Sequence, residues 1–184
     1  MPNDFKPYDD LLADLDQLSA HMNSLHAKQL NCRAGCSDCC HQHLGVFEVE
    51  AEAMRQALAA LPTDTQKVLR QQAKDVLSGT RTACPLLRED RCSLYAARPV
   101  ICRSHGYPLH YQGQEAGEIL LDVCPLNFVE AGALESLELN QTLPLDRLNL
   151  RLNAINYVYC RDRLQDVQRA EQRLPLAALV LSQL

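Results

Sequence analysis

The sequence contains no tryptophan, and aromatic residues make up only 5% of its 184 residues. It also lacks an excess of positive charge, because 18 Lys and Arg are outnumbered by 23 Asp and Glu, giving a formal net charge of -5. Nucleic-acid-binding proteins carry clustered positive charge, and those that bind single strands also stack bases on aromatic side chains. We therefore expect no nucleic-acid partner.

Long apolar runs are also missing. None approaches the roughly 20 residues that a helix needs to cross a bilayer, and the apolar segment 174–184 is too short. The polar segment 1–10 shows none of the basic start, apolar stretch and small-residue cleavage site of a secretory signal. We therefore expect no membrane partner and a cytoplasmic location, where cysteines stay reduced.

Apolar residues recur at helical spacing along much of the chain. A helix expected over about residues 8–30 carries one apolar face, formed by Leu11, Leu15, Leu18, Met22 and Leu25. The further predicted helices are one through Met54, Leu58 and Leu61 that ends at Pro62, one with a capping box of Thr63 and Gln66 that ends at Gly79, one after Pro144, and a short last one opened by Pro175. Only Glu118 to Val123 has a strand-like pattern.

This pattern predicts a mainly α fold, a small helical domain with irregular cysteine-rich loops organised around metal. The length fits a single domain over residues 1–184, with a metal-binding region of about 32–125 flanked by N- and C-terminal helices.

The nine cysteines are the most informative feature of the chain. The first group follows the pattern C-x3-C-x2-C-C and consists of Cys32, Cys36, Cys39 and Cys40. The second group is more open and consists of Cys84, Cys92, Cys102 and Cys124. In a reducing compartment a dense cysteine pattern is more typical of metal binding than of disulfides. Cys160 stands apart on a predicted helix, where we expect a buried, inert thiol.

Thiolates suit zinc and iron, and four of them complete a tetrahedral zinc site or hold a 4Fe–4S cluster. The eight thiols fit two four-sulfur sites or one site with spare thiols, and a site could draw on both groups. Zinc knuckles usually repeat C-x2-C, which occurs here only between Cys36 and Cys39. The Cys84-Pro85 and Cys124-Pro125 pairs resemble the Cys-Pro ending of ferredoxin-type runs and slightly favour iron.

The segments Cys32 to Cys40, Cys84-Pro85, Cys92 to Arg103 and Cys124-Pro125 together resemble the CxxCxxCC family, also described as YkgJ-type cysteine-cluster proteins or zinc- or iron-chelating domains. The resemblance runs from about Cys32 to Pro125, and it implies metal binding through these eight cysteines. The chain departs from the family name in placing three residues between Cys32 and Cys36. Some relatives carry this region inside a flagellin lysine methylating protein.

Several arginines and histidines accompany the cysteines. Arg98 and Arg103 are expected to support cofactor binding, because guanidinium groups offset the charge of four thiolates and can bond to sulfur or to loop carbonyls. The histidines that follow each group, His41, His43, His105 and His110, are interpreted as ordinary solvated or hydrogen-bonded residues, with His41 and His105 the best candidates for ligands.

Three functions fit these residues. The first is a metal-binding protein with a structural, storage or electron-transfer role. The second is an iron–sulfur-dependent redox or protein-modifying enzyme, and the third is a metal-free thiol redox switch built on Cys36, Cys39 and Cys40. No catalytic nucleophile motif, phosphate-binding loop or dinucleotide-binding glycine pattern is present.

Overall fold

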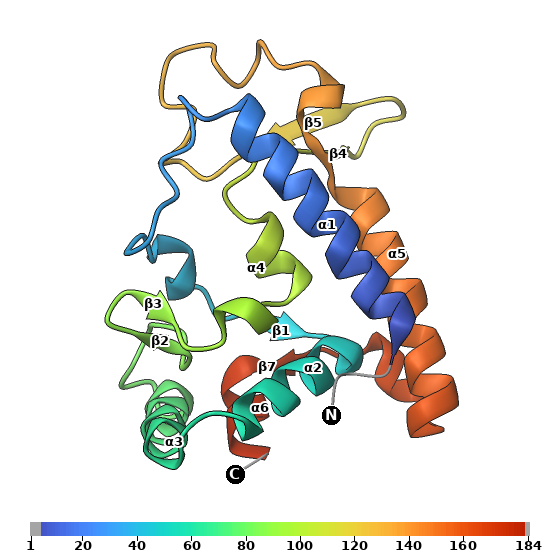
Figure 1. Cartoon of the computed structure of the whole chain (residues 1–184). Helices are drawn as coiled ribbons and strands as arrows, with labels where there is room; N and C mark the ends of the chain where they lie inside the picture. The colour runs from blue at the N-terminus through green and yellow to red at the C-terminus, as the bar shows by residue number, and fades with distance from the viewer. Residues whose placement is uncertain (1–4, 183–184) are drawn as a thin grey trace.

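Residues 5–182 are described by this computed structural model, which consists of helices joined by long loops and short strands (Figure 1). The helices are α1 (Lys6–Leu25), α2 (Glu48–Ala59), α3 (Thr63–Leu77), α4 (Val100–Ser104), α5 (Leu145–Tyr159) and α6 (Leu176–Ser182). The strands are β1 (Gly45–Val46), β2 (Leu87–Arg88), β3 (Arg91–Cys92), β4 (Leu109–Gln112), β5 (Ile119–Asp122), β6 (Leu143–Pro144) and β7 (Leu174–Pro175). About 53% of the chain is helical, which confirms the mainly α prediction.

The five longer helices lie where the sequence places them, α4 was not predicted, and α1 is shorter than predicted. It ends at Leu25 because His26 leaves the helical conformation, with φ -109° and ψ 23°. The His26 ring donates from Nε2 to the carbonyl oxygen of Gln141 at 2.7 Å. This tertiary hydrogen bond holds His26 outside the helix.

The predicted capping box of α3 is wrong. Thr63 is the first helical residue and Pro62 occupies the cap position, where a proline offers no side-chain oxygen to the free N–H groups. The Gln66 side chain instead donates to the carbonyl oxygen of Leu61 at 2.8 Å. The other end is as predicted, because Gly79 takes a positive φ of +78° just after the helix.

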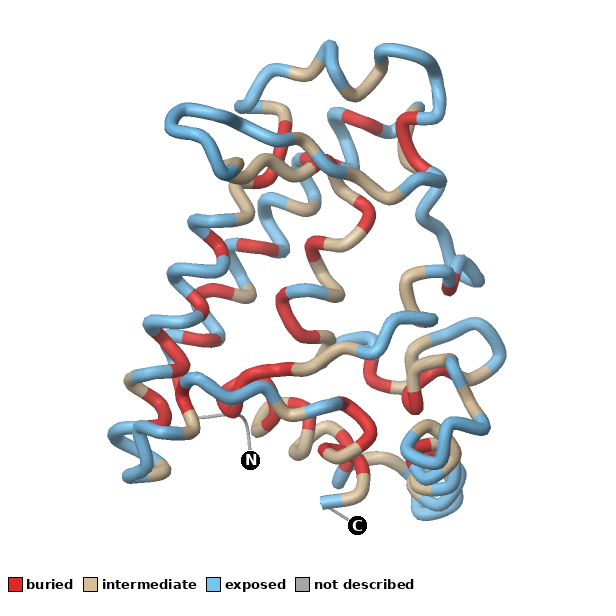
Figure 2. Tube along the Cα trace, turned by 180° about the vertical axis from the view of Figure 1, so that it is seen from behind, coloured by how far each residue is buried: buried red, intermediate tan, exposed pale blue. Residues whose placement is uncertain are grey.

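The buried residues form two apolar cores (Figure 2). In the first core α1 packs against α4 and α5, and its members are Phe5, Tyr8, Leu11, Leu15, Met22, Phe47, Val49, Val100, Leu143, Leu148, Leu152, Ile155, Tyr159, Cys160 and Ala170. In the second core α6 packs against α2 and α3, and its members are Val46, Ala51, Met54, Leu58, Leu69, Ala73, Leu86, Leu94, Leu176, Ala177, Leu179 and Val180. The two cores stabilise the helices without needing the cysteine loops to be regular.

Helix α2 contributes Val49 to the first core and Ala51, Met54 and Leu58 to the second, and it begins with a buried carboxylate. The Glu50 carboxylate, 1% exposed, accepts from the backbone N–H of Phe47 and from that of Val100, both at 2.9 Å. Burial raises the pKa of Glu50, and the two N–H donors oppose that rise. Because Val100 is the first residue of α4, this carboxylate fixes where α4 begins.

The strands are short and lie between the helices. The predicted strand is confirmed as β5, which pairs antiparallel with β4, and β6 adds to the other side of β4 in parallel. The other pairs are β2 with β3 and β1 with β7, both antiparallel. None of the helices in residues 5–182 is both long and apolar enough to cross a membrane.

Candidate metal centre

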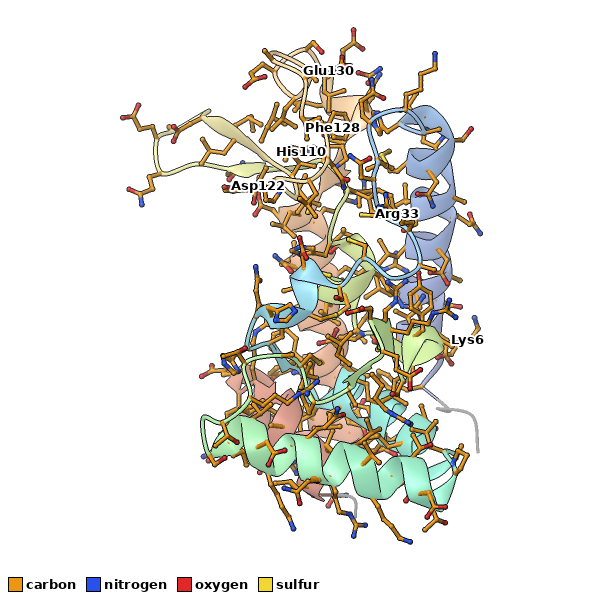
Figure 3. All side chains as sticks on the ribbon, turned by 90° about the vertical axis from the view of Figure 1, so that its left-hand side faces the viewer. Lys6, Arg33, His110, Asp122, Phe128 and Glu130 are labelled. Carbon is orange, nitrogen blue, oxygen red and sulfur yellow. The ribbon has the colours of Figure 1, made fainter. Side chains whose placement is uncertain are left out.

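Apart from Cys160, the cysteines lie in segments on one side of the molecule, and one of these segments, helix α4, packs against α1 (Figure 1). They are the loop between α1 and β1, the segment between α3 and α4, helix α4 itself, and the loop after β5. Figure 3 faces this side, and Arg33 marks the first loop. All nine cysteines are free thiols.

The first loop contains a tight turn followed by a short 3₁₀ helix. Gly35 has a φ of +92°, and the N–H of Cys36 donates to the Arg33 carbonyl oxygen at 3.0 Å. A short 3₁₀ helix over Asp38–His41 then carries Cys39 and Cys40. Three residues per turn place neighbouring side chains about 120° apart around such a helix. The two adjacent cysteines therefore leave the backbone in different directions.

The second segment is joined directly to the first. The N–H of Cys84 donates to the carbonyl oxygen of Cys40 at 2.7 Å. After Cys84 the chain makes the β2–β3 hairpin, whose last residue is Cys92. At the hairpin turn Asp90 accepts from the Ser37 hydroxyl at 3.0 Å, which is a second bond between the segments. These contacts place Cys84 and Cys92 beside Cys40.

Helix α4 brings Cys102 to the same place, and arginine side chains hold the backbone around it. Arg98 donates to the carbonyl oxygens of Tyr95 and Cys102, at 3.1 and 3.3 Å, and its guanidinium lies 3.7 Å from the Tyr95 ring centre. Arg103 donates to the Arg98 carbonyl oxygen at 2.8 Å and pairs with Asp16 of α1 at 2.6 Å. Both arginines therefore bind loop carbonyls in this structure.

The thiols near α4 influence the pKa values of one another. Burial, reinforced by the neighbouring cysteines, raises the pKa of Cys84 to about 11 and that of Cys102 to about 12. Cys39 and Cys40 share a hydrogen bond, which raises the pKa of Cys39 and lowers that of Cys40. Cys40 also interacts with Cys92. Neighbouring thiols of this kind do not all lose their protons easily, because their thiolates would repel one another. A bound cation would neutralise the negative charge of these thiolates.

Arg98 contributes to this electrostatic balance. Its charge lowers the pKa values of Cys39, Cys92 and Cys102, in opposition to burial. This is the direction that thiolate ligands need.

Cys124 and Cys32 meet at a second place, where Asn127 joins three segments. The Asn127 side chain, 2% exposed, donates to the Gly106 carbonyl oxygen at 2.6 Å and to Cys32 Sγ at 3.3 Å. Its amide oxygen accepts from the Asn31 N–H at 2.7 Å, and its own N–H donates to the Cys124 carbonyl oxygen at 2.8 Å. Sequence reasoning did not single out this residue.

A repeated backbone pattern also escaped the sequence prediction. Cys84, Cys92 and Cys124 each accept a hydrogen bond from the backbone N–H two residues further on, and these donors belong to Leu86, Leu94 and Leu126. Each bond lowers the pKa of its thiol. The spacing Cys-x-Leu, present three times in the sequence, is the signal that could have revealed it.

The thiols do not yet form a finished site. Within residues 5–182 no group of three or more Cys, His, Asp or Glu side chains stands in an arrangement that could hold a metal ion. Metal binding therefore requires the thiols to draw closer, which short loops with little regular structure allow. The chemistry of the donor set fits zinc or iron, because soft thiols with amide donors are gathered from four segments.

Comparison with known proteins decides the family. The model of the family CxxCxxCC, described as a putative zinc- or iron-chelating domain, matches residues 31–125, just over half of the chain. The chain belongs to the CxxCxxCC family. This confirms the resemblance read from the sequence, and it supports a metal ion as the partner. No curated protein and no solved structure matches the chain.

The histidines of this CxxCxxCC protein are placed differently from its thiols. His110 bonds through Nδ1 to the Thr142 hydroxyl at 2.6 Å, in agreement with its interpretation as a hydrogen-bonded residue. His41 and His43 are exposed, and His105 is half-buried at the end of α4. Cys160 is fully buried in the first core, as predicted.

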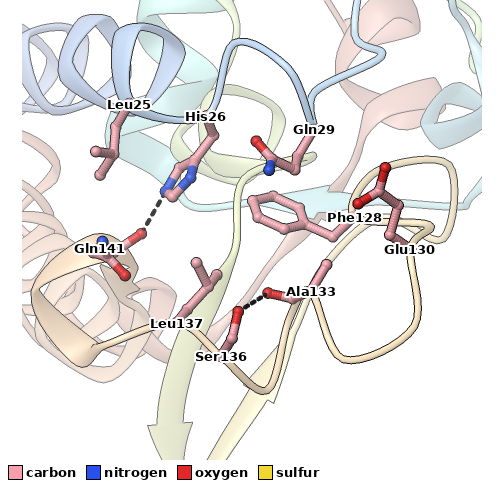
Figure 4. Close-up of a pocket in the computed structure, with 9 residues that line it drawn as sticks. All are labelled: Leu25, His26, Gln29, Phe128, Glu130, Ala133, Ser136, Leu137 and Gln141. Carbon is pink, nitrogen blue, oxygen red and sulfur yellow. Dashed lines mark hydrogen bonds between the residues drawn. The ribbon is translucent and has the colours of Figure 1, made fainter.

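A pocket of about 410 Å³ lies between the end of α1 and the loop that follows Cys124 (Figure 4). Leu25, His26, Gln29, Phe128, Glu130, Ala133, Ser136, Leu137 and Gln141 line it. The buried ring of His26 already bonds to Gln141 and packs edge-on against Phe128, with ring centres 5.1 Å apart. The N–H of Phe128 also donates to the Gln29 carbonyl oxygen at 3.1 Å. These contacts hold the Cys124 loop against the end of α1.

Proposed function

We propose that this protein binds zinc or iron in the cytoplasm through the thiolates of Cys32, Cys36, Cys39, Cys40, Cys84, Cys92, Cys102 and Cys124. The observation that carries the proposal is that the segments bearing Cys39, Cys40, Cys84, Cys92 and Cys102 are joined to one another, with the Cys84 N–H bonded to the Cys40 carbonyl oxygen. These five thiols come from three separate segments, and pairs among them interact electrostatically. Membership of a family described as a putative zinc- or iron-chelating domain supports the binding of zinc or iron.

The arginines support this proposal from the periphery. Four thiolates around a divalent cation leave two negative charges, and Arg98 is the cation whose charge already acts on Cys39, Cys92 and Cys102. Arg103 acts through Arg98, because it holds the Arg98 carbonyl and ties this turn to α1. We assign Arg98 to charge compensation and Arg103 to positioning.

The identity of the metal decides the role. Bound zinc would cross-link the three segments and serve a structural or storage function, whereas iron, alone or as a 4Fe–4S cluster, would also carry electrons. The Cys84-Pro85 and Cys124-Pro125 pairs favour iron. The alternative function is an iron–sulfur-dependent enzyme. A coloured protein that contains a cluster would be consistent with it.

Purification under anaerobic conditions, followed by elemental analysis and an optical spectrum, tests the proposal. We expect stoichiometric zinc or iron in the native chain, and a loss of both metal and stability in Cys36→Ser and Cys39→Ser. Cys160→Ala is the matched control. This variant should keep its metal, because the Cys160 thiol is buried in the first core. A folded native protein without metal, or a Cys160→Ala variant that alone loses it, would refute the proposal.

A further inference from the structure

We propose that Glu50 is a positioning residue of the metal centre, because its carboxylate ties together the two cores that carry the thiols. Cys84 and Cys92 pack against the second core. Cys102 lies on α4, which packs against α1 in the first core. The inference rests on the proposed metal binding and adds a residue that supplies no ligand atom. Glu50 acts through the backbone that carries Cys102.

The chain passes from the second core to the first just before α4. Leu94 is buried in the second core and Ala97 packs against that core, whereas Val100 is buried in the first. Cys92 precedes this passage and Cys102 follows it. The separation between these two thiols therefore depends on how the passage between the cores is held.

Glu50 holds this passage from inside the protein. One oxygen of its buried carboxylate accepts from the backbone N–H of Val100 at 2.9 Å. The other oxygen accepts from the backbone N–H of Phe47 at 2.9 Å, at the start of α2. Helix α2 then continues into the second core through Ala51 and Met54. One side chain thus joins the first residue of α4 to a helix that belongs to both cores.

A carboxylate is the group that this role needs. Burying a charge costs free energy that good hydrogen bonds must offset, and each oxygen of the Glu50 carboxylate receives one backbone N–H. An amide of the same size has only one oxygen that accepts, so its NH₂ group would face one of the two N–H donors. Glu50→Gln therefore breaks the link between the two N–H groups while it keeps the size of the side chain.

Glu48 provides a matched control on the same turn of α2. Its carboxylate is also buried, but it accepts from Arg169 Nε at 3.0 Å and pairs with Arg55 of the same helix at 3.5 Å. Neither arginine lies in the segments that carry the eight thiols. Glu48→Gln should therefore lower the stability of the fold without displacing these thiols.

The zinc affinity of the full chain, measured against a competing chelator, tests this role. Glu50→Gln should bind zinc about 10–100-fold more weakly than the wild type, the usual cost of disturbing a group that orients metal ligands. Glu48→Gln should bind zinc as the wild type does. With cobalt in place of zinc, the sulfur-to-cobalt charge-transfer bands should change in Glu50→Gln alone, because these bands report the geometry of the thiolates. A loss of stability alone would leave the bands unchanged.

Carbon-13 NMR of the wild type gives a readout that needs no substitution, and it decides alone if Glu50→Gln does not fold. Coupling between two equilibria is reciprocal, so hydrogen bonds that favour metal binding are strengthened when the metal binds. The side-chain carboxyl resonance of Glu50 should shift when zinc is added, and that of Glu48 should not.

Equal zinc affinities in Glu50→Gln and Glu48→Gln, or a Glu50 resonance that does not respond to zinc, would overturn the positioning role while leaving metal binding intact. A wild type that takes up neither zinc nor iron would instead refute the proposed function.

Discussion

Removing the metal from the native protein is expected to open the cysteine segments while α1 and α5 remain packed. Bound structural zinc contributes about 10–16 kcal/mol to the folding of zinc-finger peptides, so the loss here should reach several kcal/mol. The segments 26–44 and 80–99 contain only short hairpins and single turns of helix. Leu86 and Leu94 anchor segment 80–99 in the second core, so without bound metal only the parts of these segments outside that core, including the turns at Arg33 and Arg91, lose their support.

Limited trypsin digestion with mass spectrometry measures this effect. Arg33 and Arg91 are exposed and lie in the two segments, so cleavage after them should accelerate strongly in the chelated protein. Arg55 lies within α2 and is the matched internal control, because its helix belongs to the packed cores. Equal cleavage after Arg33 and Arg91 with and without metal would contradict the expected coupling.

Gly106→Ala should weaken metal binding that involves Cys32 by about 10–100-fold, the usual cost of disturbing the groups that orient metal ligands. A Cβ atom at this position would lie 2.7 Å from Cys32 Sγ, which is closer than the two atoms can approach. Gly106 also has a φ of +99°, where a side chain costs of order 1–3 kcal/mol in backbone strain. The substitution therefore displaces Cys32 and strains the turn after α4.

Gly117→Ala separates the two effects. Gly117 has a similar φ of +83°, but a Cβ atom there would meet nothing within 4 Å. Both variants should lose similar stability in chelated protein, while only Gly106→Ala should lose affinity when zinc is titrated against a competing chelator. Equal affinities in the two variants would show that the approach to Cys32 does not matter for metal binding.

The helices of this fold were predictable because apolar periodicity and proline positions are local signals. Pro144 and Pro175 directly precede α5 and α6, and Leu11, Leu15 and Met22 are buried as the stripe predicts. Leu18 and Leu25 are more than one-third exposed, because α1 packs on the other helices along only part of its predicted face. Periodicity shows which residues share a face and leaves open how much of that face is covered.

The sequence predicts the composition of the candidate site but not its spatial arrangement. The eight cysteines and Arg98 could be chosen from their types and spacing, but the bond between Cys84 and Cys40 joins residues 44 positions apart. Asn127 was missed because an isolated asparagine carries no pattern, and its role depends on three segments meeting. Such long-range contacts follow from how the two cores place the loops.

The central claim is that sulfur atoms from separate segments converge on one kind of cation. X-ray absorption at the zinc or iron edge of anaerobically purified native protein tests it most directly. The account predicts a first shell of sulfur alone, about four atoms per metal, with zinc–sulfur distances of about 2.3 Å if the metal is zinc. A shell dominated by oxygen and nitrogen, or native protein that holds no metal, would contradict it.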